Sequence, residues 1–589
     1  MTPGGGRPAL PDDRPLVVGI DLGTTNSLAA TLQAGEPVTI ANALGEHLTP
    51  SAVSVLTNGD LLVGAAALAR QGTHPAETAT AFKRDMGTDR KLAVGTRSFT
   101  PQDLSALILR SLRQDVEIAF GRPVDEAVIT VPAYFDELQR RATQDAATIA
   151  GLKVERIINE PTAAALAYGL HQRAREFRAV VLDLGGGTFD VTVLEVMEGV
   201  IEIQASAGDT RLGGEDFVDA LADRVVIESH REELRQDARA WAALRAACER
   251  AKRRLSTAEE AEVVLFEVPV DSGRPLSLRH PLARSRAEEA WDPLLRRMEA
   301  PVLRALRDAR VKIEQIDEVL LVGGATRTPA VIRFAARVFG RMPLRTLPPD
   351  EAVAYGAAIQ AALKIRDDAV KDVVVTDVAP FSLGISTGSI VGRQAIGGLF
   401  TPILERGTVI PASRVRTFQT LEQNQKHIAV QIFQGEHALC RENRKLGEFN
   451  IGPLRSGPAG AVSIEVRFTD DLNGLIEVEA VVPSTGQRES MLLERTPGRL
   501  TAKQISDARR DMERLKFHPR EALPNTTALA RAEALFSELT GPPRDILAAK
   551  MTALRLAIET QEPARISSAR EGLMALMPAL TSRVDRRDP

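Results

Sequence analysis

Three short apolar runs in the N-terminal part of the chain are each followed at once by a turn that is rich in glycine and threonine. The runs cover residues 16–20, 179–182 and 319–322, and continuous apolar stretches of this length predict buried strands. The first two runs end in Asp21 and Asp183, with Gly and Thr close behind. Unrelated turns have no reason to share this form, so the repetition predicts two related halves whose turns face one site.

Helical periodicity fills much of the sequence between these strands. The stretch from 101 to 120 carries one apolar stripe with helical spacing, which predicts an amphipathic helix. Asp136 is a predicted cap for the next helix, which ends near Gly151. Pro161 stands where a further helix begins, because a residue in the first turn needs no backbone N–H. The apolar stripe consists of Leu104, Leu107, Ile108, Leu112 and Val116.

The pattern changes after residue 365. A charged segment, 366–372, is followed by the β-branched apolar run 373–378, and together they predict a linker between two modules. Short alternating runs separated by turns continue to about residue 494, which predicts an all-β module. Amphipathic leucine spacing returns after Thr501 and predicts C-terminal helices. Examples of the short runs are 428–433 and 462–468, with a turn at 470–474.

The composition excludes several classes of protein. A net charge of −4 and an aromatic content of only 4% give no support to nucleic-acid binding. Cys248 and Cys440 supply neither a disulfide framework nor a zinc pattern. No apolar run is long enough to cross a bilayer, and residues 1–14 lack the apolar core of a signal peptide. We therefore expect a cytoplasmic protein of several domains that binds neither nucleic acid nor a membrane.

The turn at 183–190 combines three consecutive glycines with hydroxyl and carboxylate side chains. Glycines let the backbone bend sharply, and the exposed N–H groups of such a turn suit phosphate oxygens. The carboxylates of Asp183 and Asp190 would repel a phosphate unless a cation such as Mg²⁺ lies between them. A glycine-rich turn with solvated aspartates explains this motif equally well by itself. The recurrence of the pattern favours a metal–nucleotide site.

Two further motifs each have two explanations. Glu160, just before Pro161, either caps the helix or orders water near a phosphate, and the pattern alone favours the cap. The predicted helix at 246–256 places four polar side chains on one face, because their spacing matches the helical repeat. Spacing alone predicts that this face is exposed to solvent. The four residues are Glu249, Lys252, Arg253 and Ser256.

Taken together, these motifs resemble the seventy-kilodalton heat-shock chaperones of the DnaK type. The resemblance covers nearly the whole chain after residue 14, and the shortened outer part of the ATPase domain and the compact C-terminus are similar to the HscC-type branch. It implies an α/β actin-like ATPase domain of two lobes, an all-β sandwich that binds peptide, and a short α-helical lid. The matching stretches are 19–27, 131–135, 158–165, 183–190, 213–217, 322–327 and 350–356.

The resemblance also implies domain boundaries. They are a disordered head at 1–14, the ATPase domain at 15–369, the linker at 370–379, the β-sandwich at 380–497 and the lid at 498–589.

Within the ATPase domain the resemblance assigns roles residue by residue. Asp21 and Asp183 hold Mg²⁺, largely through water, and K⁺ is an additional candidate ion. Lys83 reaches the transferred phosphoryl group. The attacking water is oriented by Glu160, Thr188 and Asp190. The other residues implied to bind ATP or ADP are Gly23, Thr24, Thr25, Asn26, Gly185, Gly186, Gly187, Gly213, Gly214, Glu215, Glu249, Lys252, Arg253, Ser256, Gly323, Gly324, Arg327 and Asp350.

The resemblance implies a function for the rest of the chain as well. Pro132, Arg140 and Asp377 relay the nucleotide state, and the β-sandwich binds extended apolar segments of unfolded client polypeptides. A J-domain co-chaperone and a nucleotide exchange factor are implied partners. The implied peptide-binding residues are Ile385, Thr387, Phe418, Thr420, Ile428 and Val430.

Several positions depart from the family pattern. The stretch between Lys83 and Phe99 is shorter than in the common family form, which argues against binding of the usual exchange factors. Ala325 replaces a common Ser, and Leu421 stands where a small residue is common and narrows the groove. The loop 388–398 is long, and the C-terminus lacks the family's acidic motif, which leaves the completeness of the lid open.

Two other functions are compatible with parts of the sequence. A sugar or metabolite kinase shares the actin-like fold, but the β-module after the apolar linker argues against it. A nucleotide-gated scaffold without catalysis is the third hypothesis. The presence of Lys83, Glu160, Thr188 and Asp190 argues against that one.

Overall fold

The computed structural model divides the chain into two compact units, and each is described by itself. The first holds residues 1–172, 177–195 and 203–373, and the second holds 173–176, 196–202 and 374–589. The predicted disordered head, 1–14, lies outside the described residues. The described residues are 15–171, 176–197, 200–268, 275–344, 346–365, 367, 370, 374–379, 381–391, 394–470, 475–494, 525, 528–529, 532, 535–536, 539, 541–560 and 563–584.

The first half of the first unit is organised around strand β1 (Val17–Leu22), the first of the predicted runs. The sheet has the order β11-β10-β1-β2-β3, and β10 and β11 run parallel to β1 and to each other. Because β1 lies in the middle, its residues are buried on both faces. The other strands are β2 (Asn26–Gln33), β3 (Glu36–Thr39), β10 (Glu126–Val131) and β11 (Val154–Asn159).

The second half of the unit repeats this arrangement. Its strands have the order β17-β12-β13-β14. As in the first half, three strands that follow one another in the chain (β12, β13 and β14) are adjacent, and a later strand, β17, pairs parallel with the first of them. The register pairs Asp183 with Val322, so the Asp183 turn and the turn at Gly323 lie side by side. The three predicted apolar runs are therefore all strands. The bounds are β12 (Phe177–Leu184), β13 (Phe189–Met197), β14 (Val200–Asp209) and β17 (Glu318–Val322).

Helices α4 (Glu160–His171) and α10 (Ala352–Lys364) pack closely against each other within this unit. Helix α10 also packs on β1, where a Cβ at Gly19 would lie 2.2 Å from the backbone nitrogen of Ala358. A Cβ at Gly356 would lie 1.6 Å from the carbonyl oxygen of Ala163. Close approach of backbones at these places requires glycine.

The predicted helix at 101–120 is α2 (Pro101–Phe120), with the predicted bounds. Thr100 and Asp103 form a capping box at its start. Helix α3 (Glu137–Ile149) begins after the predicted cap Asp136 and ends before Gly151. The glycine-rich stretches 206–210 and 213–217 predict a loop before a helix, and this prediction is wrong for its first part. Residues 206–209 are the end of β14, and the turn begins only after Asp209.

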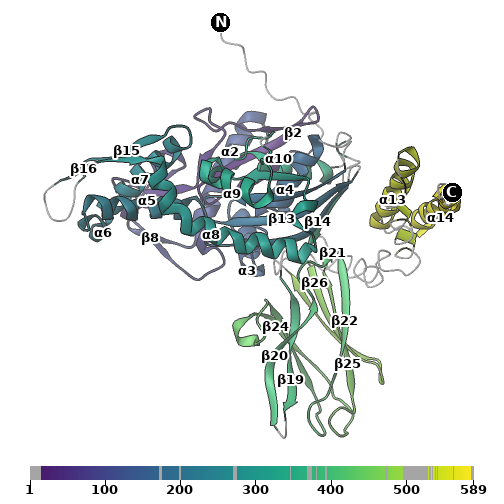
Figure 1. Ribbon diagram of the computed structural model, residues 1–589. Helices are drawn as coiled ribbons and strands as arrows, with labels where there is room; N and C mark the ends of the chain where they lie inside the picture. Colours follow the sequence, from purple (N-terminus) through teal and green to yellow (C-terminus); the bar gives the residue numbers. More distant parts are fainter. Residues whose placement is uncertain are drawn as a thin grey trace. The chain divides into compact units, whose positions relative to one another are not determined.

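The outer parts of the first unit are smaller sheets and helices. Figure 1 shows the hairpin β15–β16 extending beside α6 and α7 at one end of this unit. Among the described residues, no helix has both the length and the apolar character needed to cross a membrane. The helix bounds are α1 (Ala65–Leu68), α5 (Gly214–Ser229), α6 (Glu233–Gln236), α7 (Ala238–Leu255), α8 (Arg284–Ala309) and α9 (Pro329–Phe339). The strand bounds are β4 (Thr49–Pro50), β5 (Ala52–Val55), β6 (Leu61–Val63), β7 (Thr78–Thr80), β8 (Leu92–Val94), β9 (Arg97–Phe99), β15 (Glu260–Val268) and β16 (Leu276–Ala283).

The second unit contains two four-stranded antiparallel sheets with a common apolar core. One has the order β20-β19-β23-β24 and the other β22-β25-β26-β27, and Figure 1 shows them face to face. The predicted all-β module is therefore a sandwich. The bounds are β19 (Leu383–Val391), β20 (Gln394–Leu404), β22 (Ala412–Gln419), β23 (Ile428–Gln434), β24 (Arg444–Ile451), β25 (Ser463–Asp470), β26 (Leu475–Val482) and β27 (Gln487–Glu494).

Two predictions in this unit fall partly outside the described residues. Residues 471–474 of the predicted turn lie outside the described residues, but β25 and β26 on either side of the turn pair antiparallel. The predicted linker contains a strand, β18 (Val374–Val378), that pairs with β21 (Val409–Ile410). At the C-terminus, α13 (Pro542–Thr560) and α14 (Pro563–Val584) pack together through their own apolar cluster.

Candidate functional site

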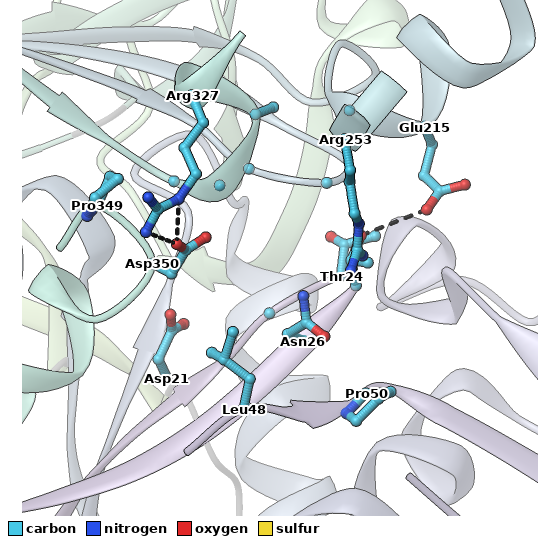
Figure 2. A pocket seen from close by; sticks show the side chains of 18 of the residues that line it. Asp21, Thr24, Asn26, Leu48, Pro50, Glu215, Arg253, Arg327, Pro349 and Asp350 are labelled. Carbon is cyan, nitrogen blue, oxygen red and sulfur yellow. Dashed lines mark hydrogen bonds and ion pairs between the residues drawn. The ribbon is translucent and has the colours of Figure 1, made fainter. Parts of the chain in front are cut away.

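A cavity of about 580 Å³ lies in the first unit where the three glycine turns meet. Figure 2 shows Arg327 and Asp350 on one side of it with Asp21 below them, Arg253 on the opposite side, and Asn26 between the two sides. The predicted residues that do not line it are Gly187, Gly213 and Asp190. Those that do are Asp21, Gly23, Thr24, Thr25, Asn26, Lys83, Glu160, Asp183, Gly185, Gly186, Thr188, Gly214, Glu215, Glu249, Lys252, Arg253, Ser256, Gly323, Gly324, Arg327 and Asp350.

The turns approach one another so closely that only glycine fits between them. A Cβ at Gly186 would lie 1.8 Å from the hydroxyl of Thr25, which belongs to the turn after β1. The backbone of Gly323 has φ +83°, and a Cβ there would lie 2.3 Å from the carbonyl of Leu184. The cradle is therefore made of backbone with little side-chain bulk, as phosphate groups require.

Three carboxylates are buried at the base of the cradle without enough positive charge to balance them. Burial, with repulsion from Glu160, raises the pKa of Asp21 to about 7 and that of Asp190 to about 8. Burial and the same repulsion raise the pKa of Asp183 well above its ordinary value. The Oδ2 atoms of Asp183 and Asp190 are buried and have no hydrogen-bond partner among the described residues.

A cation in the cavity would remove this imbalance, because an opposite charge favours the ionised carboxylates. The donor set of hard oxygens suits Mg²⁺. No three His, Cys, Asp or Glu side chains in the described ranges gather tightly enough to hold a metal by themselves. The residues therefore fit an ion that is bound partly through water and phosphate oxygens, as for Mg²⁺ with a nucleotide.

Lys83 supplies the positive charge nearest to these acids. It lies on a 3₁₀ helix (Phe82–Asp85), and its Nζ donates to Oε1 of Glu160 at 2.7 Å. The side chains are only 3% and 10% exposed, so the pair is almost fully desolvated. Glu160 is the first residue of α4, near the cap position that the pattern alone favoured, and its carboxylate turns to Lys83 in the cavity.

Helix α7 forms the wall at the other end of the cavity. The Nζ of Lys252 donates to the carbonyl of Gly214 at 3.0 Å and pairs with Glu249 at 2.6 Å. The Lys252 side chain is 11% exposed, so the solvated face expected from spacing alone is wrong for this residue. Opposite this wall, Arg327 pairs with Asp350.

Two of the three predicted relay residues, Pro132 and Arg140, lie at a turn that contacts Asp190. The carboxylate of Asp190 accepts hydrogen bonds from the backbone N–H groups of Ala133 and Tyr134, in the turn after Pro132. The guanidinium of Arg140, which is buried, donates to the carbonyls of Ala133 and Phe135 at 3.1 and 3.0 Å. Arg140 therefore fixes the turn that contacts Asp190. The side chain of the third relay residue, Asp377, lies outside the described residues.

Five of the six predicted peptide-binding residues lie on strands β19, β22 and β23 of the sandwich, and Thr420 directly follows β22. Ile385 and Val430 are buried in its apolar core, and Phe418 and Ile428 are half-buried against it. The hydroxyl of Thr387 lies 2.8 Å from that of Thr401, and Thr420 is buried.

Sequence reasoning missed several residues at the cavity. Thr130 donates to Asp21 at 3.0 Å, and Leu48, Pro349 and Val353 line the wall. Val353 belongs to the matching stretch 350–356 but was assigned no role. No local pattern marks the others, because each reaches the site through tertiary packing. Arg84 was also missed, although it follows Lys83 directly.

A cavity lined by glycine turns and buried carboxylates, followed in the chain by a β-sandwich, is the arrangement expected of an ATPase with an appended binding module. The family model described as "Hsp70 protein" matches residues 17–94 and 90–562. The chain therefore belongs to the Hsp70 family, whose members are ATP-dependent molecular chaperones with a two-lobed actin-like ATPase domain.

Curated relatives agree with this result. The proteins named "Chaperone protein DnaK" from Thermotoga petrophila, Thermotoga maritima and Thermotoga neapolitana are each 44% identical over 489 residues. The match covers 82% of this chain and 81% of each relative. The sugar-kinase alternative is not favoured by these comparisons, and the placement in the HscC-type branch stays a prediction.

Proposed function

We propose that the cavity holds ATP or ADP with Mg²⁺, and that hydrolysis of the bound ATP controls how the β-sandwich binds extended apolar client segments. We propose that this takes place in the cytoplasm. The observation that carries this proposal is the convergence of three glycine turns on buried, unbalanced carboxylates. Phosphoryl transfer depends mainly on positioning and on neutralising charge, and this cavity is suited to both.

Asp21 and Asp183 are the residues that would hold the metal, since both are buried at the base of the cradle. Mg²⁺ would supply charge neutralisation of the phosphate oxygens when bound. K⁺ is a second candidate ion. Backbone N–H groups of the turns at Gly23–Thr25 and Gly185–Gly187 would donate to the phosphates, and the α7 wall would hold the adenosine.

The catalytic roles follow from charge and reach. Lys83 has a buried ammonium group that would stabilise the transferred phosphoryl group. Glu160 and Thr188, which line the cavity, are acceptors that would orient the attacking water, and Asp190, which lies outside the lining, is a further acceptor for it. Since Glu160 already pairs with Lys83, the same carboxylate would position both groups.

Control of the β-sandwich would pass through Asp190 and the turn after Pro132. Arg140 and Asp377 would extend this relay to the linker, where a J-domain co-chaperone would act. A nucleotide exchange factor is a further candidate partner. Each client would bind by backbone pairing, with pockets near Ile385 and Phe418 selecting apolar side chains.

The direct test measures the release of a fluorescent apolar peptide from the full chain with ATP and with ADP. We expect release to be at least about tenfold faster with ATP, because the coupling between linked sites is typically of that order. The release rate of a peptide lacking apolar side chains serves as the control. Equal release rates with the two nucleotides would contradict the proposed control of the sandwich.

Asp377→Asn is expected to uncouple the two functions. It removes one charge from strand β18 and leaves the cavity intact, so basal hydrolysis is expected to stay at the wild-type rate. Stimulation of hydrolysis by peptide is expected to be lost. Steady-state phosphate release with and without peptide measures both, and a variant stimulated as strongly as wild type would remove Asp377 from the relay.

A further inference from the structure

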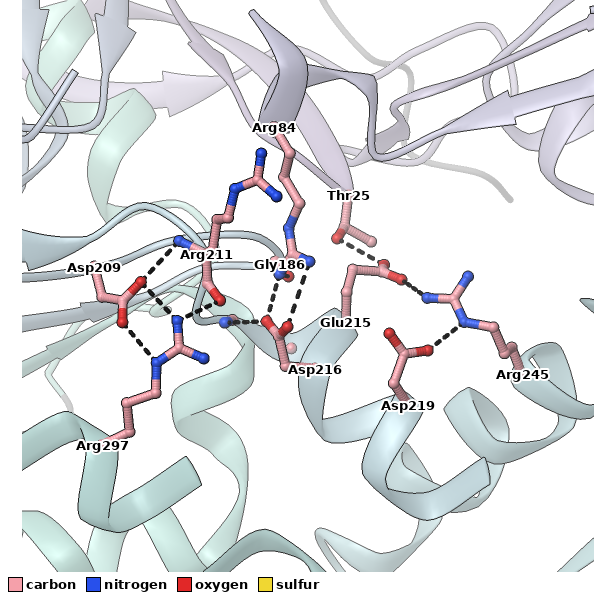
Figure 3. A network of polar contacts seen from close by, with 12 residues as sticks. Thr25, Arg84, Gly186, Asp209, Arg211, Glu215, Asp216, Asp219, Arg245 and Arg297 are labelled. Atoms are coloured by element: carbon pink, nitrogen blue, oxygen red, sulfur yellow. Dashed lines mark hydrogen bonds and ion pairs between the residues drawn. The ribbon is translucent and has the colours of Figure 1, made fainter. Parts of the chain in front are cut away.

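Arg84 joins the two halves of the first unit across the cleft. It lies beside Lys83 in the first half, yet its guanidinium contacts the second half (Figure 3). Nη2 lies 2.5 Å from Oδ2 of Asp216 and Nη1 lies 3.5 Å from Oδ1. Nη2 also donates to the carbonyl of Gly186 at 3.5 Å. We call the contact of Arg84 with Asp216 and the Gly186 carbonyl the cross-cleft pair.

The cross-cleft pair lies against the back of the phosphate cradle. A Cβ at Gly187 would lie 2.9 Å from Nε of Arg84 and 2.7 Å from the hydroxyl of Thr24. Arg84 is not among the residues that line the cavity. It therefore acts on the site through the backbone of the cradle, without touching a nucleotide.

Asp216 is held rigidly at its end of the pair. It is in the first turn of α5, and its Oδ2 also accepts from the backbone N–H of Gly213, the residue before that helix, at 2.7 Å. The side chains of Arg84 and Asp216 are 21% and 22% exposed, so water screens their attraction only in part. A charge-assisted bond in such a position is stronger than one between neutral groups.

A second contact across the cleft is weaker. The hydroxyl of Thr25 donates to Oε1 of Glu215 at 3.4 Å, and Glu215 is held from behind by Arg245 at 2.7 Å. A neutral donor at 3.4 Å contributes less than an ion pair at 2.5 Å. Of these two contacts, the one made by Arg84 therefore contributes more to holding the halves together.

We propose that Arg84 is a positioning residue whose cross-cleft pair holds the two halves closed and sets the rate at which ADP leaves the cavity. The proposal rests on the proposed nucleotide site and adds its regulation. Residues of both halves line the cavity, so separation of the halves would open it to let a nucleotide leave. This separation would break the pair and expose both charges. Because Lys83 precedes Arg84 directly, the same pair fixes the segment that carries the catalytic ammonium group.

The test is the dissociation of N-methylanthraniloyl-ADP from the full chain, chased with excess unlabelled ADP. Arg84→Gln is expected to release it about tenfold faster, the usual effect of losing a hydrogen bond to a charged group. Asp216→Asn, which keeps an acceptor for Gly213, is expected to do the same. The double variant is expected to match the single variants, because both remove one interaction.

Two further variants separate positioning from a general structural effect. Arg84→Lys keeps the positive charge but loses the planar guanidinium group that donates two hydrogen bonds. Its rate of ADP release is therefore expected to lie between those of wild type and Arg84→Gln. Arg297→Gln is the matched control, since Arg297 forms a bidentate pair with Asp209 at 2.7 and 2.9 Å inside the second half (Figure 3). Its release rate is expected to equal that of wild type.

The outcomes distinguish this proposal from the proposed function. Wild-type protein that does not bind labelled ADP would overturn both. Wild-type binding with unchanged release from Arg84→Gln would overturn the cross-cleft pair alone. Equal acceleration by Arg297→Gln would also overturn it, because the effect would then come from loss of any surface arginine. Acceleration confined to Arg84 and Asp216, with a non-additive double variant, supports it.

Discussion

Lys83→Ala is expected to lower kcat for ATP hydrolysis by about a thousandfold, the upper range for removing one group that stabilises transition-state charge. The Lys83 ammonium group is buried at 3% exposure, 2.7 Å from Glu160, so water cannot replace it easily. Binding of ATP is expected to weaken much less, because the cradle is made of backbone groups that this variant leaves unchanged. Single-turnover hydrolysis and nucleotide titration measure the two effects separately.

The same substitution leaves Glu160 buried without its partner, which costs about 3–5 kcal/mol in comparable buried pairs. A lower kcat caused by misfolding must therefore be excluded. The double variant Lys83→Ala/Glu160→Gln removes the unpaired charge and is expected to recover the free energy of unfolding without recovering hydrolysis. Lys153→Ala, which removes an exposed lysine paired with Glu126, is the matched control. Wild-type turnover by Lys83→Ala would remove Lys83 from the mechanism.

The parts of the fold that depend on local chemistry were predictable from the sequence. Helix α2 has its predicted bounds because Thr100 caps it, Pro101 suits its first turn, and Gly121 ends it with φ +70°. The strands before the glycine turns were predictable because each is a short apolar run bounded by residues that free the backbone. The recurrence of the glycine turns supplied the idea that they share a nucleotide, and the family resemblance supplied the roles of the individual residues.

Features that depend on tertiary contacts were not predictable in this way. The partner of Arg84 is Asp216, which is 132 residues away. Asp216 belongs to the matching stretch 213–217, but no local pattern indicates that it pairs with Arg84. The end of β14 was missed for a different reason. Ile203, Ala205 and Ala207 alternate with polar residues as a strand requires, but Gly208 and Asp209 suggested a turn. The periodicity was present, and the turn residues outweighed it.

Gly356→Ala is expected to lower the free energy of unfolding of the first unit by about 3 kcal/mol, the upper range for overpacking a core. The added methyl group would lie 1.6 Å from the carbonyl oxygen of Ala163 and 2.2 Å from its carbonyl carbon. Both are backbone atoms of α4, so no side chain can turn away. The contact is relieved only if α4 and α10 move apart, and this movement disturbs the packing of α10 on β1.

Tryptophan fluorescence during urea unfolding measures this change, since both tryptophans, Trp241 and Trp291, belong to the first unit. Gly340→Asn is the matched control in the same unit. Gly340 ends α9 with φ +65°, has open space around its Cβ position, and is at a position where Asn is tolerated. Its unfolding midpoint is expected to stay close to that of wild type. If Gly356→Ala and Gly340→Asn unfold at the same urea concentration, the close contact between α4 and α10 does not limit the stability of the ATPase unit.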